Sequence, residues 1–194
     1  MKMNSRMFSL VFAAVCLMVA TMAASTAMAD PMDAQASVMV GGAAMYPTRN
    51  IIQNAVNSKD HTTLVAAVKA AGLVDTLSGA GPFTVFAPTN EAFAALPAGT
   101  VDNLLKPENK ATLVKILTYH VVPGRLSADD LAAKVAAGGG KAELKTVEGE
   151  AITITKDGDQ WAVTDAKGNT AHITIGNVFQ SNGVIHVIDK VLMP

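Results

Sequence analysis

The sequence contains very little cysteine and few aromatic residues, and it has no cluster of basic residues. Its 194 residues include one cysteine, Cys16, which lies within the apolar segment near the N-terminus. Beyond that segment there is no thiol, so a disulfide framework and a thiolate metal site are excluded there. The 15 basic and 16 acidic residues are dispersed along the chain. Because phosphate binding requires clustered Lys and Arg, this distribution argues against nucleic acid as a partner.

The sequence also lacks the short motifs of common catalytic and metal sites. Its four histidines show neither H-x-H nor H-E-x-x-H spacing, so no short segment supplies several metal ligands. No G-x-S-x-G elbow surrounds Ser78 or Ser181. The glycines before Lys141 are followed by Ala142, where a phosphate loop would have Ser or Thr. We therefore expect no enzymatic activity, no cofactor and no metal.

The first 29 residues have the three parts of a secretory signal peptide. Lys2 and Arg6 precede an apolar run, and Ala27-Met28-Ala29 supplies the small residues of a cleavage site. A retained membrane anchor is the competing interpretation, but the apolar run is short and no stop-transfer segment follows it. We expect residues 1–29 to be removed, leaving a secreted or periplasmic protein, or one associated with the cell surface. Residues 30–49 are rich in Ala, Gly, Met and Pro, which predicts a flexible mature N-terminus.

From residue 50 onward, the first half of the chain has the pattern of short helices. Leu64, Val68 and Ala71 share one face of a helix that Asp60 is expected to cap and that Gly72 ends.

A strand and two further capped helices are predicted next. Residues 83–86 are typical of a strand, Pro88 ends it, and Thr89 caps the short helix that follows. Ser127 and Asp130 have the spacing of a capping box for a later helix.

After Gly140 the pattern changes from helical to alternating, which predicts a series of short strands. Asn182-Gly183 is the strongest hairpin signal and predicts a type I′ turn. This turn would pair a strand over 173–179 with another over 184–188. A helix-rich first half and a β-rich second half predict a single α+β domain.

Three stretches, in this order, resemble the fasciclin (FAS1) family. They are GPFTVFAPTNEAFAAL from residue 81, YHVVPG from residue 119 and SNGVIHVIDKVLMP from residue 181. The resemblance covers residues 50–194 and implies a FAS1 fold, a wedge-like β-sandwich of about seven strands flanked by several helices. It also implies a structural role for motif residues Thr84, Phe86, Pro88, Thr89, Asn182, Gly183, His186 and Asp189.

The resemblance further implies extracellular adhesion and protein–protein contact, usually without catalysis. In animal members an integrin-binding segment with an Asp-Ile pair lies just before the S-N-G-V element. Here the matching segment is 175–179, with Asn177-Val178 in place of Asp-Ile, and the chain has no Arg-Gly-Asp tripeptide. We therefore do not expect integrin binding. The partner-binding candidates are Tyr119, His120, Ile175, Asn177, Val178 and Phe179.

His186 and Asp189 are polar residues inside an apolar run. Residues three apart on a regular strand point to opposite faces, so as long as the strand stays regular these two cannot form one dyad or chelate one ion. Because both faces of the strand are apolar, we interpret His186 as a buried neutral imidazole bonded to the backbone or to another polar side chain. Asp189 is expected to accept backbone N–H groups where the strand ends.

The remaining candidates leave alternatives open. His120 lies in a crowded apolar setting and is either a core residue or part of a partner surface. His61 opens a helix and is expected to be solvated, whereas His172 could face either side of its strand. Trp161 is either a core residue or an exposed anchor of an interface.

Together these features predict a secreted, non-enzymatic domain that mediates adhesion or protein–protein interaction. Its partner would be an extracellular or cell-surface protein or a matrix component. The alternative is a carrier of an apolar small ligand, such as a lipid or pigment, held between the helices and the sheet.

Overall fold

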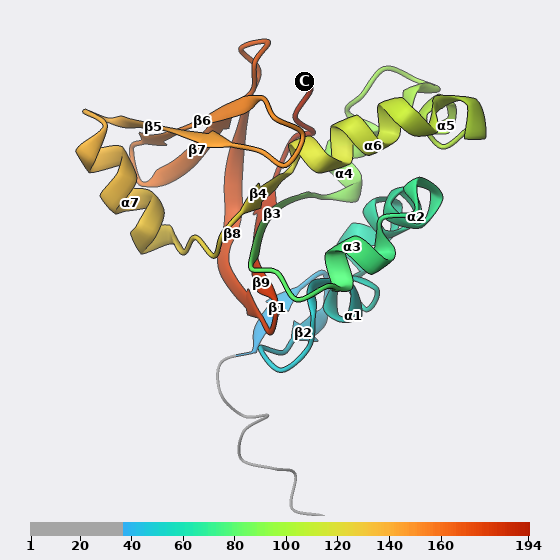
Figure 1. Ribbon diagram of the computed structural model, residues 1–194, viewed down its shortest axis with the longest axis horizontal. Coiled ribbons are helices and arrows are strands. Elements are labelled where there is room, and N and C mark those ends of the chain that lie inside the picture. Colours follow the sequence, from blue (N-terminus) through green and yellow to red (C-terminus); the bar gives the residue numbers. More distant parts are fainter. Residues whose placement is uncertain (1–36) are drawn as a thin grey trace, which may run out of the picture.

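A computed structural model describes residues 37–194, which form a mixed α+β domain (Figure 1). The α-helices are α1 (Ile51–Ala55), α2 (Thr62–Ala71), α3 (Val74–Ser78), α4 (Asn90–Ala94), α5 (Thr100–Leu104), α6 (Lys110–Tyr119) and α7 (Ala128–Ala137). The strands are β1 (Val38–Val40), β2 (Ala43–Met45), β3 (Phe83–Pro88), β4 (Val121–Pro123), β5 (Lys141–Lys145), β6 (Ala151–Asp157), β7 (Gln160–Thr164), β8 (Thr170–Gln180) and β9 (Gly183–Ile188). Two 3₁₀ turns, Lys59–His61 and Pro107–Asn109, precede α2 and α6.

Seven strands form one curved sheet in the order β4-β3-β9-β8-β7-β6-β5. Strands β3 and β9 run parallel, and the other neighbours in this sheet are antiparallel. The two edge strands approach each other, because the Val147 N–H, just after β5, donates to the Val121 carbonyl of β4 over 2.8 Å. The sheet therefore nearly closes on itself.

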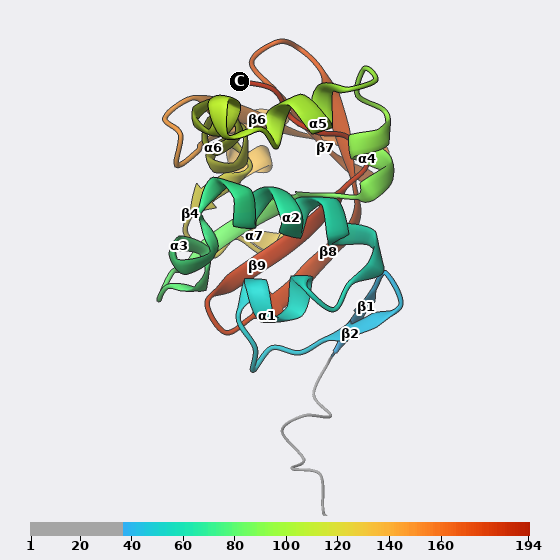
Figure 2. The ribbon, with the colours of Figure 1, turned by 90° about the vertical axis from the view of Figure 1, so that its right-hand side faces the viewer.

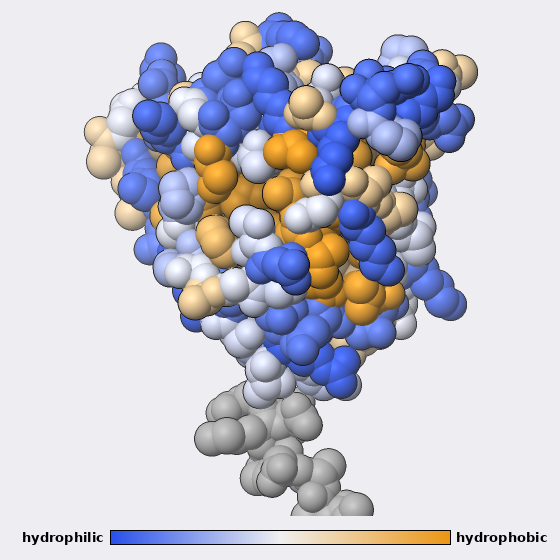
Figure 3. Space-filling model, turned by 45° about the vertical axis from the view of Figure 1, so that its right-hand side comes forward, coloured by the Kyte–Doolittle hydropathy of each residue, from blue (hydrophilic) through white to orange (hydrophobic). Residues whose placement is uncertain are grey.

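Two apolar clusters lie on opposite faces of the central strands. Side chains alternate along a strand, so Val85 and Ile185 face one cluster while Phe86 and Ile188 face the other. The first cluster fills the space between the sheet and helices α1, α2, α4 and α6, and the second fills the inside of the curved sheet under α7. Figure 2 shows the helical side face-on. In Figure 3 apolar side chains gather in the middle of the face where the helical side meets the sheet.

Most predicted helix boundaries agree with the structure, with one exception. Helix α2 buries Leu64 and Val68 and ends at Gly72, whose φ of 75° lies in the left-handed region. The prediction that Asp60 caps this helix is wrong, because Asp60 lies within the preceding 3₁₀ turn and His61 occupies the capping position. Thr89 caps α4, accepting from the Ala92 N–H over 3.2 Å. The capping box of α7 is also present.

Residues 38–45 have more regular structure than the sequence predicts. The sequence predicts flexibility over residues 30–49, but 38–45 form the hairpin of β1 and β2. Val40 and Met45 are buried in the first cluster, and Asn54 of α1 bonds to both the N–H and the carbonyl of Tyr46. The prediction of flexibility is therefore wrong for this hairpin, and the domain includes it.

Residues 1–36, with the predicted signal peptide and cleavage site, lie outside the described residues. Among residues 37–194, no helix is long and apolar enough to cross a membrane.

Strands β8 and β9 form the predicted hairpin, but the turn differs from the prediction. Gln180 pairs with Gly183, so the two turn residues are Ser181 and Asn182, and neither has a positive φ. The expected type I′ turn at Asn182-Gly183 is therefore wrong. Glycine is required at position 183 because β9 passes very close to the backbone of β3 there. A Cβ at this position would lie 2.0 Å from the Phe83 carbonyl oxygen.

The Asn182 side chain joins three elements instead of shaping the turn. Its Oδ1 accepts from the Ile51 N–H over 3.0 Å, and its Nδ2 donates to the carbonyls of Leu77 and Gly79 over 2.8 and 2.9 Å. These bonds tie the hairpin to the start of α1 and the end of α3.

Candidate functional site

The residues predicted to bind a partner do not form one surface. Tyr119, His120 and Val178 are buried, with exposed fractions of 0%, 2% and 0%. Phe179 is 37% exposed, which makes it one of the few large apolar side chains at the surface of the described domain. A partner surface that includes Tyr119, His120 or Val178 is therefore inconsistent with the structure. Ile175 and Asn177 are half-buried.

Tyr119 and His120 fix the end of α6 within the fold. The Tyr119 hydroxyl donates to the Ala151 carbonyl over 3.2 Å and accepts from the Ala166 N–H over 2.9 Å, and burial raises its pKa. Nε2 of His120 accepts from the Leu192 N–H over 3.0 Å. An N–H can only donate, so His120 carries its hydrogen on Nδ1, 2.8 Å from the Ile116 carbonyl. Burial lowers the pKa of His120 to about 4, so this imidazole is neutral near pH 7.

A double irregularity in β8 places the 175–179 segment. The register with β9 shifts between Ile173 and Ile175 and again between Ile175 and Val178. Asn177 within it has a φ of 57°, a left-handed conformation that Asn tolerates better than most residues. Its Oδ1 accepts from the Ala128 N–H over 2.7 Å, so the bulge of β8 bonds to the first turn of α7.

Two buried side chains hold the loop between β4 and α7. The Thr84 hydroxyl donates to the Gly124 carbonyl over 2.7 Å and accepts from the Leu126 N–H over 2.9 Å. Nε2 of His186 lies 2.9 Å from the Leu126 carbonyl. A carbonyl only accepts, so Nε2 is the protonated nitrogen and His186 is a donor to the loop backbone.

The remaining contacts of His186 are apolar. Its ring stacks on Phe86 with centroids 5.7 Å apart, and Nδ1 has no hydrogen-bond partner among the described residues. A Cβ at Gly176 would lie 3.4 Å from Nδ1, so the bulge of β8 passes directly beside it. Burial lowers the pKa of His186.

These partly buried hydrogen bonds position an exposed pair of side chains. The Arg125 guanidinium lies 5.3 Å from the centre of the Phe179 ring, within the range of a cation–π contact. Arg125 belongs to the loop held by Thr84 and His186, and Phe179 follows the bulge held by Asn177. We call Arg125 and Phe179 the Arg125–Phe179 pair. The sequence points to Phe179 through the family motif, but no local pattern singles out Arg125.

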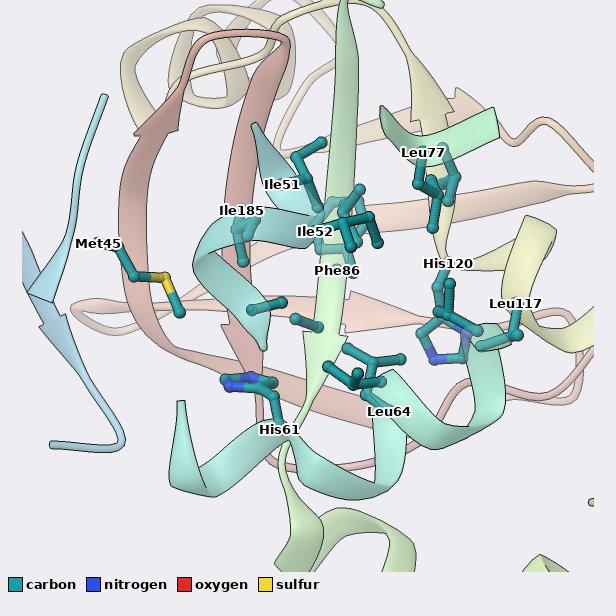
Figure 4. Close-up of a pocket in the computed structure, with 16 residues that line it drawn as sticks. Met45, Ile51, Ile52, His61, Leu64, Leu77, Phe86, Leu117, His120 and Ile185 are labelled. Carbon is teal, nitrogen blue, oxygen red and sulfur yellow. The ribbon is translucent and has the colours of Figure 1, made fainter. Parts of the chain in front are cut away.

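An apolar cavity lies in the first cluster, between the sheet and helices α1, α2, α3 and α6 (Figure 4). Its free volume is about 30 Å³, and Met45 of β2 forms part of its wall. His61 and His120 are the polar residues among its lining side chains.

The prediction that His61 is solvated is wrong, because it is only 1% exposed. Its Nδ1 lies 2.9 Å from the Ser58 hydroxyl, and burial lowers its pKa. The signal that could have located it is helical spacing, since His61 comes three and seven residues before Leu64 and Val68, which lie on the buried face of α2.

The other predicted residues have structural contacts. Asp189 Oδ1 accepts from the His172 N–H over 2.7 Å, as expected for the end of β9, and its Oδ2 lies 3.4 Å from His172 Nδ1. Trp161 is half-buried against the second cluster, and the Lys156 ammonium lies 5.8 Å from its ring centre. Phe86 is buried in that same cluster, and Pro88 ends β3. Across residues 37–194, no three His, Cys, Asp or Glu side chains are grouped so as to hold a metal ion.

Comparison with known proteins gives consistent results. The family model described as Fasciclin domain matches residues 59–194. The chain is 51% identical over 171 residues to protein sll1483 of Synechocystis, covering 88% of this chain and 87% of that protein. It is 34% identical to the cell surface glycolipoprotein MPB83 of Mycobacterium bovis, covering 88% and 77%.

A solved structure shows the same fold. The FAS1 domain pair of fasciclin I, described as an insect cell adhesion molecule, matches with a TM-score of 0.69 at 17% sequence identity. The match covers 82% of this chain and 58% of the solved chain, and it shows that this domain has the FAS1 fold.

Replacing His186 with Ala is expected to lower the free energy of unfolding by roughly 2–4 kcal/mol, because a cavity forms and the Leu126 carbonyl loses its donor. His186→Gln, which can keep one hydrogen bond, should lose less. Urea unfolding of both variants checks this, with His172→Ala as a control because the His172 side chain is 32% exposed. A His186→Ala protein as stable as the wild type would show that the imidazole does not hold the loop.

Acidification from pH 7 to below pH 5 is expected to destabilise the protein. His120 has a pKa of about 4 in the folded state and about 6.5 when unfolded, so between these values the unfolded state binds more protons. The stabilisation by neutral His120 is complete above pH 6.5 and falls by roughly 3 kcal/mol by pH 4. Lowered pKa values at His61 and His186 act in the same direction.

Urea unfolding across this pH range, in wild type and His120→Gln, isolates the contribution of His120. The variant should be less stable at pH 7 but should show a shallower loss on acidification. If stability fell equally with pH in the two proteins, the loss on acidification could not be assigned to His120.

Proposed function

The chain belongs to the fasciclin (FAS1) family, and from that premise we propose that it is a non-enzymatic domain that binds a protein partner outside the cytoplasm. The observation that carries this proposal is the Arg125–Phe179 pair, an exposed aromatic ring and a guanidinium whose backbone is held by partly buried hydrogen bonds. Aromatic residues and Arg are the side chains that contribute most to protein interfaces, and a rigid pair loses little entropy on binding.

The partner is expected to present a carboxylate beside an apolar side chain. No ion pair engages Arg125 among residues 37–194, so its N–H groups are free to bind a carboxylate. The ring of Phe179 would contact the apolar side chain. Within the same bulge, Asn177 bonds to the first turn of α7 and Val178 is buried in the core. The partner would therefore contact the side chains around Asn177 and Val178 and not these two residues themselves.

The relatives support a location at the cell surface or outside the cell. One is named a cell surface glycolipoprotein, and the solved fasciclin I pair is described as part of a cell adhesion molecule. Together with the predicted signal peptide, these names support secretion or display at the surface for this chain. Fasciclin-family proteins are generally not enzymes.

A carrier function is the second candidate, and it would require the cavity between the helices and the sheet to hold the ligand. Its free volume of about 30 Å³ is far below what a lipid or pigment requires, since even benzene occupies an engineered cavity of about 150 Å³. Protein binding is therefore the function that the geometry supports better.

Replacing Phe179 with Ala, or Arg125 with Ala, is expected to weaken partner capture at least tenfold without lowering the melting temperature by more than a few degrees. The partner would be isolated with the immobilised wild-type protein from envelope and medium fractions of the native host, and its affinity for each purified variant would be measured. Val147→Ala is the matched control, because Val147 is also an exposed apolar residue but belongs to the β5–β6 connection.

Full affinity in both Phe179→Ala and Arg125→Ala would contradict this placement of the surface. A loss in Val147→Ala equal to the loss in Phe179→Ala would contradict it as well, because it would indicate a non-specific apolar contact.

A further inference from the structure

Residues 37–194 contain two arginines, and each lies over an aromatic ring. Arg125 belongs to the pair already described, whereas the Arg49 guanidinium lies 5.0 Å from the centre of the Tyr46 ring. Arg49 is exposed, and no ion pair engages it among the described residues. A cation–π contact orients a guanidinium and leaves N–H donors available for an anion.

The backbone around Arg49 is fixed at several points. Its N–H donates to the Tyr46 carbonyl over 3.1 Å, which closes a turn with Pro47 in the second position. Its carbonyl accepts from the Ser181 N–H over 2.9 Å, so the turn is attached to the β8–β9 hairpin. The Asn54 side chain bonds to both backbone groups of Tyr46. The guanidinium therefore extends from a rigid turn, which reduces the entropy lost on binding.

Arg49 borders an open hollow on the outer side of α1, the helix beside the end of the β8–β9 hairpin (Figure 2). The other lining residues are Gln53 and Val56, which are three apart in a helical segment and therefore lie on the same face. The volume of the hollow is about 330 Å³, within the range of roughly 300–1,000 Å³ that is common for ligand sites. No acidic side chain of residues 37–194 lines it.

The capping box of α1 determines how the Gln53 amide is oriented. Its Oε1 accepts from the Asn50 N–H over 3.0 Å, while the Asn50 side chain accepts from the Gln53 N–H over 2.8 Å. Because the amide oxygen is engaged with the backbone, the NH₂ group of Gln53 is left as a donor at the surface. The hollow thus has a guanidinium and an amide NH₂ beside the Val56 side chain, which is 47% exposed.

These three side chains match a carboxylate that is joined to a short aliphatic group. The carboxylate oxygens would accept from both donors, and the aliphatic group would contact Val56. In an extended chain, an acidic side chain and an aliphatic neighbour point to opposite faces, so the two would not reach one hollow. In the last residue of a polypeptide, the α-carboxylate and the side chain branch from the same Cα. The open side of the hollow leaves room for the rest of such a chain.

We propose that the hollow lined by Arg49, Gln53 and Val56 binds the C-terminal residue of another polypeptide. Its α-carboxylate accepts from the Arg49 guanidinium and the Gln53 NH₂ group, and its aliphatic side chain packs on Val56. A free amino acid is disfavoured because its α-ammonium would lie beside the guanidinium. This site is separate from the Arg125–Phe179 pair, so its test does not depend on the proposed function.

N-acetyl-leucine and N-acetyl-leucinamide test this, because they share the aliphatic group and differ in the charge of the terminal group. Each is titrated into the ¹⁵N-labelled protein, and the signals of the Gln53 NH₂ group and the Arg49 Nε–H are followed. N-acetyl-leucine should give saturable shifts with an affinity at least about tenfold higher than the amide, as expected for charge-assisted hydrogen bonds. N-acetyl-glycine should bind more weakly than N-acetyl-leucine, since it has no side chain to contact Val56.

Three variants assign the contacts to residues. Gln53→Glu keeps an oxygen for the Asn50 N–H but replaces the NH₂ group with a negative oxygen, so it should abolish saturable binding while the helix stays folded. Arg49→Leu should lose the preference for the carboxylate. Lys156→Leu is the matched control and should bind as the wild type does, because Lys156 is also a cation over an aromatic ring but belongs to β6.

The proposal is overturned by the absence of saturable shifts, by equal affinities for N-acetyl-leucine and its amide, or by a carboxylate preference that survives in Arg49→Leu or Gln53→Glu. Equal affinity for N-acetyl-glycine would overturn it as well, because the hollow would then not recognise an aliphatic residue. Acetyl-aspartyl-leucinamide has the same two groups on consecutive residues. If it bound more tightly than N-acetyl-leucine, the hollow would recognise an internal acidic segment and not a C-terminal residue.

Discussion

The attachment of the 124–127 loop to the parallel pair of strands β3 and β9 is the constraint on which the surface of this domain depends. Thr84 of β3 and His186 of β9 point to the same side of the sheet and bond to the N–H and the carbonyl of Leu126. Asn177, from the bulge of β8, bonds to the next segment at Ala128. Because each of these side chains is fixed within the sheet, the loop has little freedom, and Arg125 within it is held over Phe179.

The same central strands explain why polar residues lie within the core. β3 and β9 are covered on both faces, so nearly every side chain along them is buried, including Thr84 and His186. A polar group in that position must be bonded, and the loop backbone supplies the partner. Burial also lowers the pKa of His120 and His186, so both imidazoles are neutral at pH 7, and a neutral ring still has one N–H to donate to a backbone carbonyl. His61 differs because one of its nitrogens is left without a partner among the described residues, beside a cavity.

The sequence predicts the family motifs, the α+β layout, and most helix caps, because these depend on local spacing and residue type. Strand alternation also predicts that His186 and Asp189 act separately while the strand stays regular, although β9 ends one residue before Asp189. Three features could not be obtained this way. The order of residues 38–45 comes from burial of Val40 and Met45 against distant elements. The turn at Ser181 and Asn182 is set by the approach of Gly183 to Phe83 and by three bonds from Asn182. The contact between the exposed Arg125 and the Phe179 ring follows only from the fold.

Amide hydrogen exchange at Leu126 in the Thr84→Val variant tests this central claim most directly. Val matches Thr in shape and suits a strand, so the change removes the hydroxyl and little else. The Leu126 N–H donates to that hydroxyl in the wild type. We predict that its exchange becomes at least about tenfold faster in the variant, as expected from the loss of one hydrogen bond, while the Val187 amide of β9 keeps its protection. Equal protection of Leu126 in both proteins would show that Thr84 does not hold the loop, and it would contradict the account.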